Sequence, residues 1–189
     1  MEVHILTFNC LHFKGALKVK RFLAICLVAI IIIFGVFYML DYVKIKKDHY
    51  EFVAFQNFLN EGFFPVLNDS FLHLDQAADE LEASTFIEWY QHAEGLEENT
   101  IFQAKIEDTE MKVLDEEVRG ENTLQLKKNI LKQIVLLQDT FILLYDSASK
   151  PDLSTTALQE AFASNIEGLS LLSEQMDTII EENMVVEEE

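Results

Sequence analysis

Three histidines in the acidic part of the chain, His49, His73 and His92, have the side chains best suited to chemistry, because imidazole can bind a metal or transfer a proton near neutral pH. Asp75 follows His73 by two residues, and Glu88 precedes His92 by four. A dinuclear metal site in a helical bundle needs Glu-x-x-His on two helices and two further inward glutamates. That pattern is absent, so we expect surface histidines, no metal and no cofactor.

Motifs for other kinds of catalysis are also missing. The segment at 115–122, "DEEVRGEN", lacks the alternating Asp/Asn residues and the closing Glu of a calcium loop. The chain has no Gly-rich phosphate loop, no G-x-S-x-G and no nucleophile beside a basic partner. The sequence therefore predicts a protein that is not an enzyme and has no catalytic residue.

Aromatic side chains form two groups that could bind a protein partner. An exposed aromatic cluster can anchor a partner, whereas aromatics at helical spacing are also typical of a bundle core, and the sequence leaves both interpretations open. The candidate partner-binding residues are Phe52, Phe55, Phe58, Phe63 and Phe64, followed by Trp89 and Tyr90.

The charge balance excludes one class of partner. Residues 48–189 contain 31 acidic and 7 basic residues, a net charge of −24. Phosphate binding depends on Lys and Arg, so we expect no nucleic-acid binding. Both cysteines, Cys10 and Cys26, precede this region, which must therefore be held together by packing without a disulfide.

A run of 19 apolar residues, 22–40, is long enough to cross a membrane as a helix. It is longer than the core of a cleaved signal peptide and has no small residues at its end for a peptidase. Cys26 does not match a lipoprotein signal, because Ile25 precedes it and the apolar run follows it. We interpret 22–40 as an uncleaved single-pass transmembrane anchor in contact with membrane lipid, with a cleaved signal as the alternative.

Four basic residues precede the apolar run and three follow it, a weak bias toward a cytoplasmic N-terminus and an extracytoplasmic C-terminal domain in the cell membrane. Two interpretations of residues 1–18 remain open. They form a short cytoplasmic tail, or translation starts at Val19 and they are not made.

Helical periodicity continues beyond the span. Apolar residues recur every three or four positions from Phe52 to Leu81, so we expect the membrane helix to run on into the domain, with a kink or restart at Pro65. Thr85-x-x-Glu88 and Thr100-x-x-Gln103 have the pattern of capping boxes, so 85–120 is predicted as two helices or one broken helix.

Two further helices are predicted at 122–149 and from Thr156, where a third capping pattern begins and a coiled-coil-like seam follows. The predicted fold is therefore all-α, with an N-terminal transmembrane helix followed by an antiparallel bundle of about four long helices. The expected organisation is a tail at 1–21, the anchor at 22–40, an acidic bundle at 41–183 and an acidic tail at 184–189.

These observations predict a membrane-anchored bundle that acts by protein–protein interaction, as an accessory, scaffold or modulator subunit of the cell envelope. The alternative is a ligand-binding or sensory four-helix module that works with a separate output protein. The sequence leaves a homo-oligomer open, although Gly35 alone provides no small-xxx-small motif for pairing of the spans.

Overall fold

The structure is a computed structural model that describes the backbone of residues 3–149 and 155–184, and the side chains of residues 30–92, 95–149 and 156–184. The described backbone contains five helices and no strand, which confirms the predicted all-α class. The helices are α1 (Val3–Glu82), α2 (Phe86–Gln91), α3 (Ala93–Asp115), α4 (Glu121–Ser149) and α5 (Thr155–Met184).

The chain divides into two units, Met1–Lys47 and Asp48–Glu189. Helix α1 passes from the first unit into the second, as predicted, and it includes Pro65 without a break in the assigned helix. Among the described residues, no helix is both long enough and apolar enough to cross a membrane. Residues 22–29, the first part of the predicted 22–40 anchor, lie outside the described side chains, as does most of the predicted 1–21 tail; residues 185–189 of the predicted acidic tail are also outside the description.

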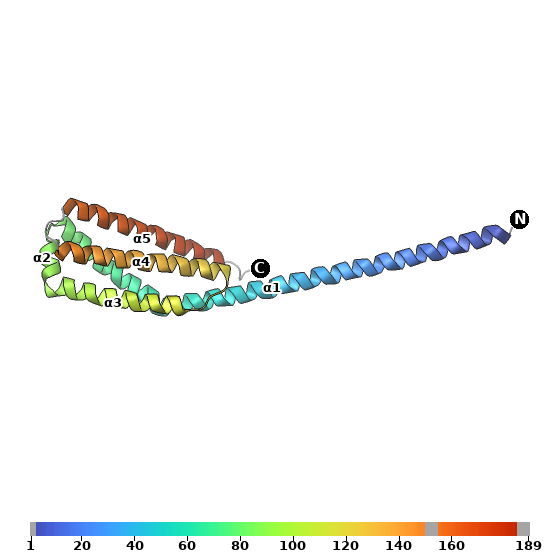
Figure 1. Ribbon diagram of the computed structural model, residues 1–189, viewed down its shortest axis with the longest axis horizontal. Helices are drawn as coiled ribbons and strands as arrows, with labels where there is room; N and C mark the ends of the chain where they lie inside the picture. Colours follow the sequence, from blue (N-terminus) through green and yellow to red (C-terminus); the bar gives the residue numbers. More distant parts are fainter. Residues whose placement is uncertain (1–2, 150–154, 185–189) are drawn as a thin grey trace. The chain divides into compact units, whose positions relative to one another are not determined.

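In the second unit, the C-terminal part of α1 lies beside α3, α4 and α5, and the short α2 crosses one end of the bundle (Figure 1). The predicted bundle of about four long helices is thus present, with α2 as an additional short element. At the opposite end, the carboxylate of Glu51 accepts hydrogen bonds from the backbone N–H groups of Arg119 (2.5 Å) and Gly120 (2.7 Å). These bonds hold the start of the bundle part of α1 against the α3–α4 turn.

The turn between α1 and α2 is a Schellman motif. The backbone N–H of Thr85 donates to the carbonyl of Glu80 and that of Ser84 to the carbonyl of Leu81, while Ser84 has a φ of 62°. The Thr85 hydroxyl donates to the Glu80 carboxylate at 2.6 Å and makes no cap bond to α2. The predicted capping box at Thr85 is therefore wrong, because Glu80 in the preceding turn satisfies the hydroxyl.

The helix start predicted at Thr100 is wrong. Thr100 lies inside α3, and its hydroxyl donates to the carbonyl of Leu96 one turn earlier. The chain breaks instead at His92, where the backbone is extended between α2 and α3. A Ser or Thr within a helix can bond back to the preceding turn, so the local pattern alone does not mark a helix start.

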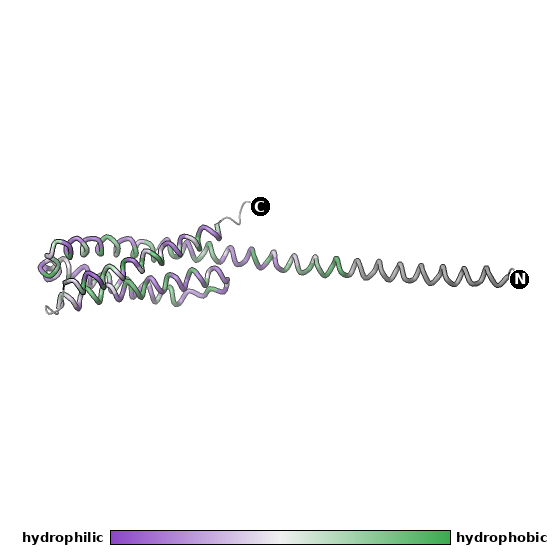
Figure 2. The backbone as a smooth tube through the Cα atoms, turned by 90° about the horizontal axis from the view of Figure 1, so that it is seen from above, coloured by the Kyte–Doolittle hydropathy of each residue, from purple (hydrophilic) through white to green (hydrophobic). Residues whose placement is uncertain are grey.

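Hydrophobic burial holds the bundle together. Each of the four long helices contributes an apolar face, and Figure 2 shows hydrophobic and hydrophilic residues alternating along the helices of this unit. The largest fully buried apolar side chains are Phe52, Phe55, Leu59, Phe63, Leu74, Leu81, Tyr90, Ile106, Leu126, Ile130, Ile134 and Phe141.

Candidate functional site

The predicted partner-binding aromatics lie mainly inside the bundle. Four of them have exposed fractions of only 2% and three are half-buried against the core, so the bundle itself covers most of their apolar surface. This placement corresponds to the core interpretation that the sequence left open. The buried residues are Phe52, Phe55, Phe63 and Tyr90, and the half-buried ones are Phe58, Phe64 and Trp89.

His73 differs from the surface histidine that the sequence predicted. Its side chain is 1% exposed and lies among the rings of Trp89, Phe102 and Phe141, with ring centroids 5.2–5.7 Å away. His73 is buried because it lies on the inner face of α1, three residues after the buried Ser70 and four before the buried Ala77. These small side chains carried no strong apolar signal, so the buried face was hard to recognise at this position.

The electrostatics of His73 follow from one charged partner and an apolar surrounding. Its Nδ1 lies 2.9 Å from Oε2 of Glu98, a carboxylate on α3 that is half exposed. Burial lowers the pKa of His73 below the usual 6.5, and the hydrogen bond and charge of Glu98 oppose this only in part. The neutral ring donates from Nδ1 to Glu98, and Nε2 has no hydrogen-bond partner within the described residues.

Other buried polar groups occur on the helices around this histidine. Within the described part of the chain, Trp89 Nε1, Tyr90 Oη and both side-chain polar atoms of Asn99 have no partner. Burial, with a smaller contribution from Tyr145, raises the pKa of Tyr90 and keeps its hydroxyl neutral. We call His73, Trp89, Tyr90 and Asn99 the polar–aromatic cluster.

Three polar side chains between α4 and α5 are hydrogen-bonded to one another or to the backbone. Asn129 donates to the carbonyl of Leu172 at 3.0 Å, and Gln133 Nε2 donates to Asn129 Oδ1 at 2.7 Å. Ser173 donates to Gln133 Oε1 at 3.4 Å, and Met176 Sδ lies 3.6 Å from Gln133 Nε2. This set, the α4–α5 network, fixes the register of the two helices.

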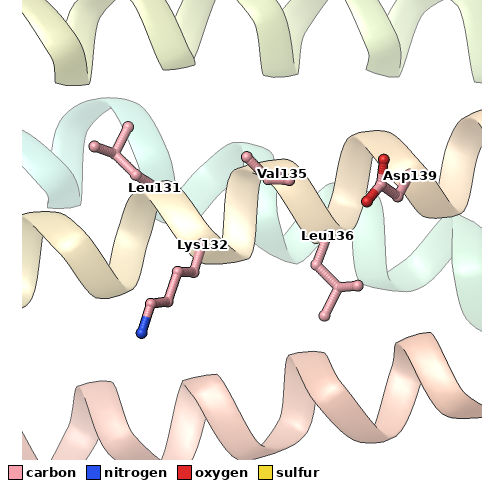
Figure 3. Close-up of a pocket in the computed structure, with 5 residues that line it drawn as sticks. All are labelled: Leu131, Lys132, Val135, Leu136 and Asp139. Atoms are coloured by element: carbon pink, nitrogen blue, oxygen red, sulfur yellow. The ribbon is translucent and has the colours of Figure 1, made fainter.

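The outer surface of α4 has a groove of about 460 Å³ (Figure 3). Leu131, Val135 and Leu136 line it with apolar atoms (Figure 3). Two charged residues of the same helix, Lys132 and Asp139, complete the lining. This surface was not predicted from the sequence. Its apolar residues Leu131 and Val135 are four residues apart, a spacing that places them on one side of the helix.

A second groove, of about 260 Å³, lies between α3 and α4 and includes Glu107, Glu110 and Asp139. Gln138 donates to Glu110 across it at 2.7 Å. Among the described residues, no three His, Cys, Asp or Glu side chains are placed to hold a metal ion.

Comparison of the chain with protein-family models, with curated proteins and with solved structures finds no match.

Proposed function

We propose that this protein is a membrane-tethered helical bundle that acts by binding another protein and catalyses no reaction. The tether is the segment 22–40, and the bundle lies on the extracytoplasmic side as an accessory, scaffold or modulator subunit. In this arrangement, the N-terminal part of α1 holds the protein at a membrane surface, and the bundle presents the face that binds the partner.

The observation that carries the binding role is the outer face of α4. Val135, which lines the apolar groove with Leu131 and Leu136, is 48% exposed. Ile142, which lines the groove between α3 and α4, is 53% exposed. Helix α4 has equal numbers of acidic and basic residues, whereas α5 has six acidic residues and no basic one. A protein partner therefore finds apolar contact on α4 without the strong negative charge of the remaining bundle surface.

The described part of the N-terminal unit supports the tether. From Ile30 to Ile45, large apolar side chains project outward with exposed fractions of 52% to 77%. Figure 2 shows the same stretch of α1 as mostly hydrophobic. A helix that is apolar on all sides is stabilised by lipid or by other protein, because water solvates such a surface poorly.

The binding role is tested with a photo-crosslinking amino acid at Val135 of the full-length protein in native membranes. Asp177, an exposed position on α5, is the matched control. We expect a discrete crosslinked protein from position 135 and none from position 177. Equal crosslinking from both positions, or none from either, would overturn the proposal.

The tether is tested by introducing Ile31→Arg together with Phe34→Arg. Each arginine costs about 3 kcal/mol at the centre of a membrane helix, so the variant should be released from membranes by alkaline carbonate while the wild type is retained. Tyr50→Arg, at an exposed position in the bundle unit, is the control and should stay bound. Release of wild type and variant alike would contradict the tether.

A ligand-binding role is the second candidate, because a groove of about 410 Å³ lies between α1 and α5. Leu74 and Phe162 supply apolar surface there, and Asp75 and Glu167 supply carboxylates. Its size is within the range of small-molecule sites. Thermal-shift screening against small cationic amphiphiles tests this role, and Glu167→Gln should weaken any such ligand while leaving crosslinking at position 135 unchanged.

A further inference from the structure

Helix α4 is the place where two copies of this chain can approach each other without strong repulsion. The bundle unit carries a net charge of −24, so most pairs of faces would bring like charges together. The charges of α4 instead balance: three acidic residues, Glu121, Asp139 and Asp146, accompany three lysines, Lys127, Lys128 and Lys132.

The charges on the outer face of α4 are also ordered along the helix. Lys128 and Lys132 precede Val135, and Asp139 follows it. The apolar residues Leu131 and Ile142 lie on the two sides of Val135. A helix face with a basic first half, an apolar centre and an acidic second half is complementary to itself when it is turned end for end.

The three charged side chains of this face are available for such a contact. Lys128, Lys132 and Asp139 are exposed, and none makes a hydrogen bond or an ion pair with another described residue. Figure 3 shows Lys132 and Asp139 extending from α4 on either side of Val135 along the helix. An ion pair with a second chain would therefore break no contact within the first.

We propose that a second copy of this chain docks on α4 in antiparallel orientation, about a two-fold axis that passes between Val135 and Leu136. Lys132 and Asp139 lie at equal distances on either side of this axis, about one helical turn away. Lys132 of each copy then faces Asp139 of the other, and both apolar grooves close around Val135. Leu131 of one copy packs near Ile142 of the other, so the same surface serves both partners.

The orientation follows from the charges. In a parallel pair about an axis along the helices, Lys132 would face Lys132 and Asp139 would face Asp139, and both contacts repel. In the antiparallel pair both become attractive. The inference rests on the proposed binding role of the α4 face and identifies its partner as a second copy.

Disulfide trapping tests the geometry in the full-length protein. Cys10 and Cys26 are replaced by serine, and Val135→Cys places one thiol next to the proposed axis. Under mild oxidation in native membranes, we expect a disulfide-linked dimer for Val135→Cys. Ser170→Cys, at an exposed position on α5, is the matched control and should remain a monomer. No dimer from position 135, or equal dimer from position 170, would overturn the inference.

Charge reversal tests the pairing itself. Lys132→Asp and Asp139→Lys, each added to the Val135→Cys protein, should reduce the trapped dimer about tenfold, because each places like charges opposite one another. The double exchange, Lys132→Asp with Asp139→Lys, should restore it, which also shows that the single variants had not simply failed to fold. Failure of the double exchange to restore the dimer would contradict the antiparallel pairing.

The two proposals can fail separately. If position 135 photo-crosslinks a different protein while the disulfide dimer is absent, the α4 face binds a partner but the partner is not a second copy. If neither the photo-crosslink nor the disulfide forms, the binding role of the face is itself wrong.

Discussion

Two regions of the bundle bury polar side chains, and they do so in opposite ways. In the α4–α5 network, Asn129, Gln133 and Ser173 find partners on the facing helix. In the polar–aromatic cluster, His73 keeps one hydrogen bond, and both polar atoms of the Asn99 side chain have none within the described residues. A buried polar group stabilises a fold only when it is bonded, so removing a polar side chain should cost stability in the first region and little or none in the second.

The largest expected loss comes from breaking the α4–α5 network. Gln133→Ala removes a side chain that is 0% exposed and leaves Asn129 Oδ1 without its donor. We expect a loss of about 3 kcal/mol in the free energy of unfolding, measured by urea denaturation followed by circular dichroism. Gln125→Ala, at an exposed position on the same helix, should change it by less than about 0.5 kcal/mol. Equal losses for both variants would refute this view of the network.

Alanine substitutions at two glycines, Gly95 and Gly168, test how tightly the backbone is packed in the two regions. A Cβ on Gly95 would lie 2.7 Å from the Cα of Tyr90, so α2 or α3 must move to admit it. We expect Gly95→Ala to cost about 2 kcal/mol in unfolding free energy despite the better helix propensity of Ala.

Gly168, on α5 where it faces α4, is the control for that substitution. A Cβ there would lie 2.8 Å from Cδ2 of Leu136, the end of a flexible side chain at the edge of the outer groove. Rotation of Leu136 relieves the overlap, so Gly168→Ala should leave the melting temperature nearly unchanged. A larger drop for Gly168→Ala than for Gly95→Ala would reverse the comparison.

Removing an unbonded polar group should slightly increase the free energy of unfolding, whereas Gln133→Ala and Gly95→Ala should decrease it. Asn99→Leu replaces a buried amide that has no partner with an apolar side chain of similar size. We expect a gain of up to about 1 kcal/mol in unfolding free energy. Asn129→Leu, which removes bonded groups of the α4–α5 network, should destabilise the bundle in the same denaturation experiment. If Asn99→Leu is as damaging as Asn129→Leu, the Asn99 amide stabilises the bundle and the expected difference between the two regions is wrong.

The smallest effect is a dependence of stability on pH. Because the pKa of His73 is lowered in the folded protein, the unfolded chain binds more protons as the pH falls below about 6.5. The stability contributed by neutral His73 is therefore present above that pH and decreases as the pH falls toward the folded pKa. His73→Phe should remove this part of the slope in melting temperature between about pH 7 and pH 5, and identical slopes in both proteins would contradict it.

Features of the fold that depend on the spacing of residues along one helix could be predicted from the sequence, and features that depend on contacts between helices could not. The helical class and the core of α5 followed from periodic Leu158, Phe162, Leu169 and Met176, because the spacing of apolar residues carries that information directly. The burial of His73 did not follow, because it depends on rings from α2, α3 and α4 that meet only in the folded bundle. The helix after Thr85 begins where the pattern predicted, at Phe86, but the capping box did not form, because the Thr85 hydroxyl donates to Glu80 in the preceding turn.

The site was harder to predict than the fold for a related reason. The seven aromatic candidates were chosen for their size, and large aromatics are also what a core requires. The groove on α4 consists of common aliphatic and charged residues, whose exposure becomes clear only when the inner face of the helix is known.

The contact of Glu51 with the α3–α4 turn has a consequence for a pair of such chains. It places the Asp48 end of α1 at one end of the bundle, beside the start of α4. An antiparallel dimer about the middle of α4 would then direct the two Asp48 ends away from each other, separated by about the length of that helix, roughly 45 Å. Such a pair would therefore keep the two chains apart at the points where each enters its bundle.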